Sequence, residues 1–204
     1  MLNFIGIGSA FNTELANTSA FVKNNNSLLL IDCGGTVFHR LQELNMFDGL
    51  ENLYIIITHT HPDHVGSLGE VIFYSYYILN HIPTIFFPNK EILEGFLTSI
   101  GVSAEMYKLN SSEIIDVNDT QLGKFRIEFL PVPHVDTIPA YGFIMKLKEK
   151  SFYYSGDANN ISLKKLCSIV QPEFRNKVYC MHLDKHITNE EISDKGFNVV
   201  EVYK

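Results

Sequence analysis

The sequence has little positive charge and lacks a long apolar run. Among its 204 residues, 16 lysines and arginines stand against 23 aspartates and glutamates, which gives a formal net charge of −7. Binding along a nucleic-acid duplex requires a basic surface that neutralises phosphates, so this balance argues against duplex DNA or RNA. No stretch approaches the ~18 consecutive apolar residues of a transmembrane helix. We therefore expect neither a membrane nor duplex nucleic acid as a partner.

Tryptophan is absent and cysteine is scarce. The three cysteines, Cys33, Cys167 and Cys180, are odd in number and form no C-x-x-C pair, as in a reduced protein rather than a disulfide framework. The first residues lack the basic segment and the apolar stretch of a signal peptide. A cytoplasmic location is therefore expected.

The abundant residues are those of a globular chain. Hydrophobic residues make up 46% of the sequence, enough for one substantial core, and residues 1–204 are expected to form a single domain. Expected strands lie at 2–7, 18–23, 27–31, 53–57, 85–87, 113–117, 124–132, 141–148, 151–155, 177–181 and 197–203. Expected helices follow the capping residues Thr36, Ser67 and Thr188, and two more lie at 91–100 and 162–170. Groups of strands followed by helices favour two packed sheets with helices outside them.

Four metal-capable side chains lie within six residues, directly after the apolar run at 53–57. They are His59, His61, Asp63 and His64. A buried strand that carries imidazoles and a carboxylate into a loop builds a metal site on a rigid support. Because the alternation separates the first two residues from the last two, one loop can serve two ions. A run of solvated loop histidines is the alternative interpretation.

Four further polar residues follow apolar strands at the point where each strand is expected to end. They are Asp32, His134, Asp157 and His182. Any one of them alone is usually an ordinary loop residue. Four such cases in a chain that also holds the histidine loop favour a site assembled at one edge of the sheets.

Together these residues resemble the five ordered motifs of the metallo-β-lactamase fold. The resemblance implies an α/β protein, an αββα sandwich of two mixed β-sheets with outer helices and a two-metal site at one sheet edge. It assigns His59, His61 and His134 to the first ion and Asp63, His64 and His182 to the second. It makes Asp157 a bridge between the ions and places Asp32 behind a histidine that it orients. Imidazoles and carboxylates suit Zn²⁺, so we expect two Zn²⁺ ions, with Mn²⁺ as the alternative.

The segment around His134 resembles RNase Z and its phosphodiesterase relatives, because a Gly-aromatic strand at Gly142-Phe143 follows the histidine after a few residues. Lactonases, glyoxalase II, class B lactamases and flavodiiron proteins have motif residues that differ from those of this sequence. Two features depart from RNase Z: no long arm separates His134 from Asp157, and residues 158–181 contain no histidine. The truncated pattern is similar to that of phage anti-Pycsar enzymes and other small cyclic-nucleotide phosphodiesterases.

These observations favour a two-zinc phosphodiesterase that hydrolyses a small phosphodiester by attack of a metal-bridging hydroxide, with a 3′,5′-cyclic mononucleotide as the favoured substrate. We expect Asp63 to accept a proton from the hydroxide and Asp157 to hold both ions. Water or His186 would protonate the leaving oxygen. Three alternatives stay open: an RNase Z-like RNA 3′-processing nuclease, a lactone or thioester hydrolase, and a metal-holding sensing module without catalysis.

Several further residues lie outside these motifs. The helical segment 71–79 is apolar on nearly every face, which predicts a buried side and a homodimer interface. Phe11 and Tyr141 lie near the motif loops and are candidates for stacking on a base. His39 and His81 are expected at the surface or at helix ends rather than in the metal site.

Overall fold

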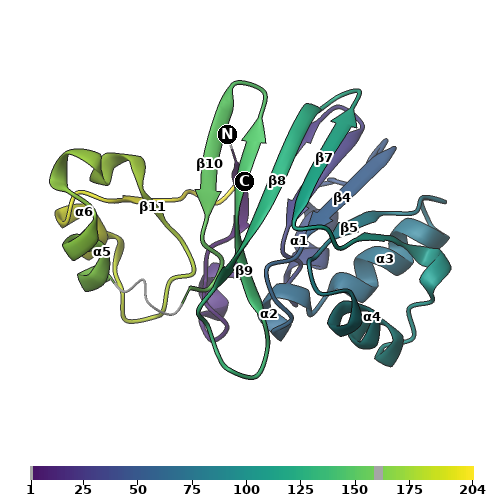
Figure 1. Ribbon diagram of the computed structural model, residues 1–204, viewed down its shortest axis with the longest axis horizontal. Helices are drawn as coiled ribbons and strands as arrows, with labels where there is room; N and C mark the ends of the chain where they lie inside the picture. The colour runs from purple at the N-terminus through teal and green to yellow at the C-terminus, as the bar shows by residue number, and fades with distance from the viewer. Residues whose placement is uncertain (1, 159–162) are drawn as a thin grey trace.

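The computed structural model describes residues 2–158 and 163–204 and contains a six-stranded mixed sheet (Figure 1). Its strands, in spatial as in sequence order, are β1 (Asn3–Gly6), β2 (Ser19–Asn24), β3 (Ser27–Ile31), β4 (Asn52–Ile56), β5 (Thr84–Phe86) and β6 (Lys108–Asn110). The first three strands pair antiparallel, and β3 to β6 pair parallel. Parallel pairing brings the carboxyl ends of β3 and β4 to the same edge, which is where Asp32 and the histidine loop begin.

The second sheet has four strands in the order β10-β9-β8-β7. They are β7 (Ile114–Asp119), β8 (Gly123–Val132), β9 (Ala140–Leu147) and β10 (Lys150–Tyr154). All pairings in this smaller sheet are antiparallel, because its consecutive strands are joined by short connections. Both sheets were expected to be mixed, but only the larger one is. A parallel pair, β11 (Tyr179–Cys180) and β12 (Asn198–Val199), is shorter than the strands expected at 177–181 and 197–203.

The helices lie outside the sheets or at the sheet edges (Figure 1). They are α1 (Val37–Glu43), α2 (Pro62–Val65), α3 (Leu68–Tyr77), α4 (Lys90–Ser99), α5 (Leu163–Ile169) and α6 (Asn189–Asp194), with 3₁₀ turns η1 (Thr13–Leu15), η2 (Ala104–Met106) and η3 (Pro172–Lys177). Within 2–158 and 163–204, none of them is both long and apolar enough to cross a membrane.

Only one of the three expected capping hydroxyls caps its helix. Thr188 forms a capping box with Glu191, as its position before a helix predicts. Thr36 and Ser67 precede α1 and α3 but make no side-chain cap. Oγ1 of Thr36 instead accepts from the backbone N–H of Asn17, and Oγ of Ser67 donates to the carbonyl of Gly34. Long-range partners therefore replaced the local bond that a cap would make.

Two hydrophobic clusters pack on the two faces of the larger sheet. Alternate residues of β3 point in opposite directions, so Leu28 and Leu30 face the cluster formed with α1, α3 and α4. Leu29 and Ile31 face the other cluster, which contains Phe143 of β9 and fills the space between the two sheets. A strand covered on both faces reads as a continuous apolar run, as β3 does. The sandwich fixes the sheet edge on which the polar residues meet.

Candidate metal centre

The histidine loop begins where β4 ends and turns at once into helix α2. His61 is the residue before that helix, and Pro62 occupies its first position, where the missing N–H costs nothing. The helical turn brings Asp63 and His64 back beneath the loop. The side chains of His59 and His64 are almost fully buried, at 0% and 1% exposure, so the loop histidines are not a solvated run.

The structure brings seven of the residues identified in the sequence into two adjacent groups. The first group comprises His59, His61 and His134, and the second comprises Asp63, His64, Asp157 and His182. Within each group, one ligand atom from every residue lies within 4.8 Å of the others. Two sets of nitrogen and oxygen ligands at this spacing are suited to two metal ions.

Asp157 contacts both groups through one oxygen. Its Oδ2 lies 3.1 Å from Nε2 of His182 and 3.3 Å from Nε2 of His64. The same oxygen lies 3.8 Å from Nε2 of His59, in the first group. A carboxylate in this position has the geometry that a bridging ligand needs.

Asp32 lies behind His64 and is fully buried. Its Oδ2 is 2.9 Å from Nδ1 of His64, and its Oδ1 accepts from the backbone N–H of Thr58. The hydroxyl of Thr58 contacts the same carboxylate and also lies 3.0 Å from Nδ1 of His59. Thr58 thus links one histidine of each group to a single carboxylate. Nothing in its residue type or spacing marked it in the sequence.

Close backbone packing holds the loops in place. A Cβ at Gly34 would lie 2.0 Å from the carbonyl oxygen of Asp63, so only glycine fits between the loop after β3 and helix α2. Asp32 and His182 adopt the left-handed backbone conformation, with φ of 60° and 58°. Such strain is uncommon outside glycine and concentrates at functional sites.

Burial and charge set the protonation of the cluster. Burial, with the nearby His64, lowers the pKa of His59 to about 2, so its imidazole is neutral at physiological pH, as a metal ligand requires. Burial opposes charge on His64, but Asp32, Asp157 and Asp63 hold its pKa well above the ordinary value. A metal ion bound at Nε2 of His64 would displace the proton that these carboxylates favour.

Two buried nitrogens support a fit between these residues and metal ions. Of the described residues, His59 and His64 each have a buried Nε2 that makes no hydrogen bond within the protein. Buried polar atoms are nearly always hydrogen-bonded, so such atoms at the centre of a ligand cluster indicate a bound group. Imidazole nitrogens and carboxylate oxygens without a thiolate are ligands that Zn²⁺ and Mn²⁺ both accept.

Three other residues named in the sequence lie outside the two groups. His186 is exposed in the turn where the N–H of Ile187 bonds to Asp184, and its role as a proton donor stays a prediction. His39 is exposed beside Glu43, and His81 accepts from the backbone N–H of Leu53, as expected for residues outside the site.

Tyr141, one of the two stacking candidates, contacts other aromatic rings of the protein. Its ring packs edge-on against Phe87 and Phe129, with centroid separations of 5.6 and 6.2 Å, and its backbone N–H bonds to Thr58. These contacts cover part of the ring, which is half-buried, and its role in stacking on a base stays a prediction. Phe11, the other candidate, is 86% exposed.

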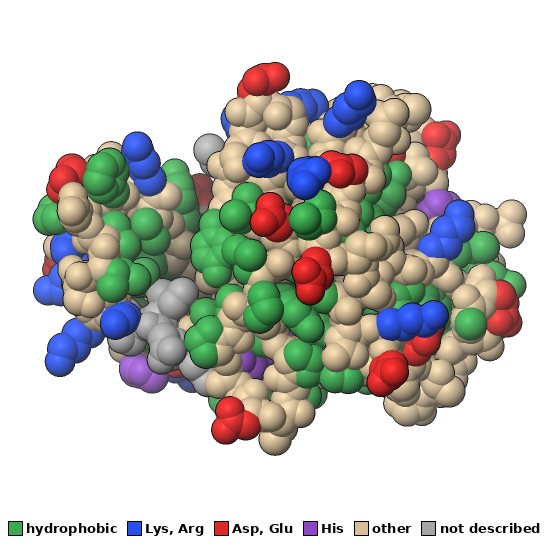
Figure 2. All heavy atoms as spheres, viewed as in Figure 1, with side chains coloured by type: hydrophobic (Ala, Val, Ile, Leu, Met, Phe, Trp, Pro, Cys, Tyr) green, Lys and Arg blue, Asp and Glu red, His purple; other side chains and the backbone are tan. Residues whose placement is uncertain are grey.

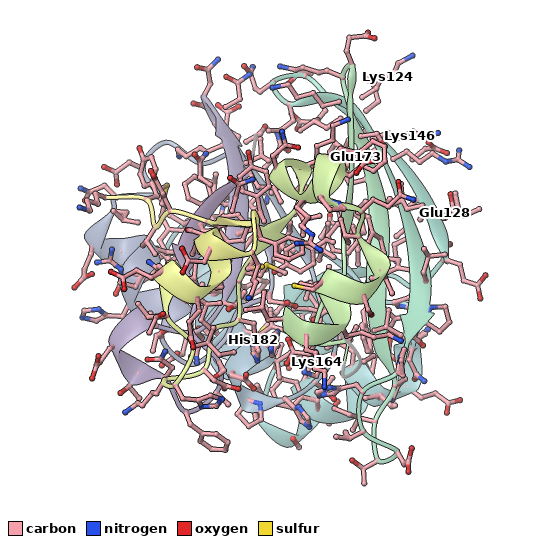
Figure 3. All side chains as sticks on the ribbon, turned by 90° about the vertical axis from the view of Figure 1, so that its left-hand side faces the viewer. Lys124, Glu128, Lys146, Lys164, Glu173 and His182 are labelled. Atoms are coloured by element: carbon pink, nitrogen blue, oxygen red, sulfur yellow. The ribbon has the colours of Figure 1, made fainter. Side chains whose placement is uncertain are left out.

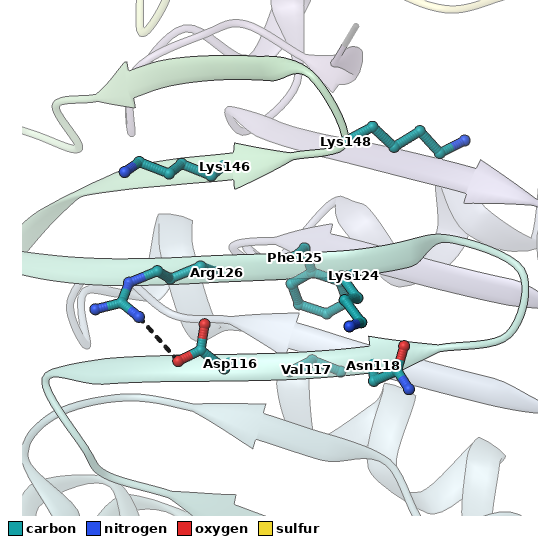
Figure 4. Close-up of a pocket in the computed structure, with 8 residues that line it drawn as sticks. All are labelled: Asp116, Val117, Asn118, Lys124, Phe125, Arg126, Lys146 and Lys148. Carbon is teal, nitrogen blue, oxygen red and sulfur yellow. Dashed lines mark hydrogen bonds and ion pairs between the residues drawn. The ribbon is translucent and has the colours of Figure 1, made fainter.

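The basic side chains of the smaller sheet lie at the end away from the cluster. Lys124 is the second residue of β8, whereas His134 follows the other end of that strand. Figure 3 shows Lys124 and Lys146 near the top of the molecule and His182 in its lower half. An open pocket near the turns is lined by Lys124, Arg126, Lys146 and Lys148, with Arg126 paired to Asp116 at 3.0 Å (Figure 4). Acidic and apolar side chains interrupt these cations on the face seen in Figure 2, so no continuous basic surface forms there.

The two facing sheets, with seven metal-capable side chains at one edge, define a metallo-β-lactamase fold protein. The structure is similar to that of the metallo-β-lactamase fold protein YhfI from Bacillus subtilis, with a TM-score of 0.75, 15% identity and coverage of 100% of this chain and 95% of that one. It is also similar to a diphosphatase of the PhnP family, with a TM-score of 0.69, 16% identity and coverage of 98% and 94%. At such identities these likenesses show the fold.

The chain belongs to the family described as anti-Pycsar protein Apyc1, whose sequence profile matches residues 1–162. The anti-Pycsar protein Apyc1 of Paenibacillus harenae is 30% identical over 165 residues. That match covers 76% of this chain and 66% of the relative, so this chain spans just under two thirds of the relative's length.

Proposed function

We propose that this protein is a two-metal phosphodiesterase whose substrate is a 3′,5′-cyclic mononucleotide. The observation that carries the proposal is the position of Asp157, with one oxygen 3.1 Å from His182 and 3.8 Å from His59. A carboxylate shared by two ligand groups suits a pair of ions that act on one phosphate. Membership in the anti-Pycsar family and the resemblance to cyclic-nucleotide phosphodiesterases support a cyclic substrate.

The seven residues would hold two Zn²⁺ or Mn²⁺ ions. Bound there, such ions supply a hydroxide at neutral pH and positive charge opposite the phosphate oxygens. His59, His61 and His134 would hold one ion, while Asp63, His64 and His182 would hold the other beneath Asp157. Two divalent ions would add four positive charges to the formal −7, so an anion would be attracted to this edge of an acidic protein.

Three side chains would manage protons and orientation. The carboxylate of Asp63, 9% exposed at its side chain, would accept a proton from the attacking group because it lies in the second group and reaches solvent. Asp32 keeps Nδ1 of His64 hydrogen-bonded, so Nε2 points toward Asp63 and Asp157. Water, or His186 from the exposed turn, would protonate the leaving oxygen.

The short connections support a small substrate. Strand β8 ends at Val132 and β9 begins at Ala140, so the segment carrying His134 has no room for an arm that grips a folded RNA. The cations of the smaller sheet lie at the opposite end from His134. A folded RNA needs remote contacts to position the scissile bond, whereas a mononucleotide does not.

A substrate panel tests the proposal. Protein loaded with zinc or manganese would be assayed on 3′,5′-cyclic mononucleotides, bis-p-nitrophenyl phosphate, a lactone, single-stranded RNA and a pre-tRNA. We expect cyclic nucleotides to be opened to linear monophosphates and pre-tRNA to be processed poorly. Efficient removal of a tRNA 3′ trailer, with cyclic nucleotides intact at millimolar concentration, would refute the proposal. Turnover of the lactone alone, or of no substrate, would favour a hydrolase of another class or a sensing module.

A matched pair of variants guards the assay against a contaminant. Asp157→Ala removes the carboxylate that contacts both groups, and His39→Ala removes an exposed imidazole that pairs only with Glu43. Activity of this protein should vanish in the first variant and persist in the second. Equal activity in both would show that the turnover arises elsewhere.

A further inference from the structure

The loop between β1 and β2 is tied to the residue that follows His182. The backbone N–H of Leu183 donates to the carbonyl of Ile7 at 2.8 Å. In return, the carbonyl of Leu183 accepts from the backbone of Ser9 at 3.2 Å and from Nδ2 of Asn12 at 2.9 Å. One end of the loop is thus held next to a residue of the second group.

The other end of the loop is held beside Asp63. The backbone N–H of Asn17 donates to Oγ1 of Thr36, and Oδ1 of Asn17 accepts from the N–H of Thr36. A Cβ on Gly34 would lie 2.8 Å from Cβ of Asn17 and 2.0 Å from the carbonyl oxygen of Asp63. Asn17 is therefore packed next to the segment that supports the second group, so the loop borders the metal centre at both ends.

Phe11 lies between these two attachments, and 86% of its surface is exposed. The loop around it is well ordered: Asn12 is buried and bonds to Ser9 and Leu15, and Gly8 bonds to Ala16 at 2.8 Å. An aromatic ring on a fixed backbone loses little conformational entropy when it binds a flat partner. Neither hydrophobic cluster includes Phe11, so packing within the chain gives no reason for its aromatic ring.

We propose that Phe11 is a substrate-positioning residue whose ring stacks on the base of a nucleotide held at the metal centre. The inference rests on the proposed function, because the phosphate would be held by the ions while the base extends toward the β1–β2 loop. Every base offers a flat π face, so an aromatic ring confers affinity with little preference among bases. Removal of one stacking ring weakens nucleotide binding by about 5- to 150-fold.

The experiment compares Phe11→Ala, Phe11→Tyr and Phe174→Ala in the metal-loaded protein. Phe174, on η3, is a second exposed aromatic residue, at 50%, and serves as the control. We expect Phe11→Ala to raise KM for cyclic nucleotides about tenfold, with a much smaller change in kcat. Phe11→Tyr should restore KM, and Phe174→Ala should leave it unchanged. The 3′,5′-cyclic phosphate of methyl riboside, which lacks a base, should be hydrolysed equally by Phe11→Ala and the wild type.

Several results would overturn the inference. Unchanged KM in Phe11→Ala, or an equal loss on the base-free ester, would remove the stacking role while leaving the proposed function intact. Loss of a dimer in Phe11→Ala, measured by light scattering, would make the ring an interface residue instead. If the wild type hydrolyses no cyclic nucleotide, calorimetric titration with a nucleoside 5′-monophosphate still tests whether Phe11 stacks on a base. Tighter binding by the wild type than by Phe11→Ala then supports stacking, and equal or absent binding rejects it.

Discussion

The Oδ2 atom of Asp32 lies 2.9 Å from Nδ1 of His64, and both side chains are buried, at 0% and 1% exposure. This contact fixes the ring of His64 so that Nε2 points toward Asp63 and Asp157, at 3.3 Å from each carboxylate. A carboxylate behind a metal-binding imidazole sets its tautomer and increases its basicity. Asp32 would therefore act on a metal bound at His64 through the imidazole that it orients.

Replacement of Asp32 should weaken the second metal site selectively. In Asp32→Ala, His64 loses the group that orients it, and we expect the affinity of the second ion to fall by about 10- to 100-fold. The first group is connected to Asp32 only through the hydroxyl of Thr58, so its ion should be retained more firmly. Competition titration with a zinc chelator measures both affinities. Asp116→Ala, on an exposed strand residue, is the control, and equal weakening of both sites would contradict the role assigned to Asp32.

Metal content should depend on Asp157. Elemental analysis of gently purified protein should find close to two ions per chain, since two ligand groups are present. Asp157→Ala should lower this content and abolish turnover together, because its Oδ2 contacts both groups. His39→Ala should change neither. One ion or none in the wild type, without uptake on titration, would refute the two-metal proposal.

Metal removal should destabilise the fold. Ions that bind the native state stabilise it by about 2.7 kcal/mol at a free concentration of 100 times Kd. For a chain of this size that corresponds to a rise in Tm of roughly 5–10 °C. Thermal unfolding monitored by circular dichroism, with a chelator and then with added zinc, tests this. A Tm that is the same in both conditions would indicate that the cluster does not bind the metal.

Asp119 should stabilise the contact between the two sheets in a pH-dependent way. Its Oδ2 accepts from Ser27 at 3.0 Å and from Tyr54 at 3.1 Å, while Oδ1 accepts from the backbone of Gln121 and Leu122. Burial alone would raise the pKa of Asp119, but these hydrogen bonds hold it below the ordinary value of 3.8. A depressed pKa means that its contribution is complete above the unfolded-state pKa and is lost as pH falls through the folded-state value.

Urea unfolding measures that contribution. At pH 7, Asp119→Ala should be less stable than the wild type by about 1–3 kcal/mol, because buried donors lose their acceptor. The difference should diminish below about pH 4. Asp116→Ala on the same strand, whose carboxylate is exposed and pairs with Arg126, should cost about 0–1 kcal/mol. A stability difference between the wild type and Asp119→Ala that stays constant down to the lowest pH at which both still fold would contradict the role given to the Asp119 carboxylate.

A homodimer is expected through the exposed end of α3. Phe73 and Tyr74 pack against the cluster under the helix, but Tyr77 and Ile78 are 64% and 66% exposed. We propose that a second copy covers them. Light scattering at micromolar concentration should report a dimer for the wild type and a monomer for the double variant Tyr77→Ser, Ile78→Ser. A monomeric wild type would remove the idea. The single domain expected for residues 1–204 likewise stays a prediction.

Much of the fold and of the candidate site was predictable because the deciding signals are local. The apolar run of β4 predicts a buried strand, and the residues that follow it predict a loop with metal ligands: His59, His61, Asp63 and His64. Parallel pairing of β3 with β4 then follows from their apolar character and sets Asp32 beside that loop. The hairpins β7–β8 and β9–β10 of the smaller sheet were predictable from their turn residues, whereas the antiparallel pairing of β8 with β9 was not, because both sheets were expected to be mixed.

The sequence by itself determined which residues have the chemistry to bind metal, since residue type and position after a strand depend on nearby residues alone. Tertiary structure decided how they are supported and what surrounds them. The bonds of Thr36 and Ser67 to distant loops, the aromatic contacts of Tyr141 and the role of Thr58 each depend on contacts between segments far apart in the chain. The attachment of Asn12 to Leu183, 171 positions away, ties the loop that carries Phe11 to the residue after His182. No local pattern encodes such contacts, because they form only when the sheets pack and bring the loops together.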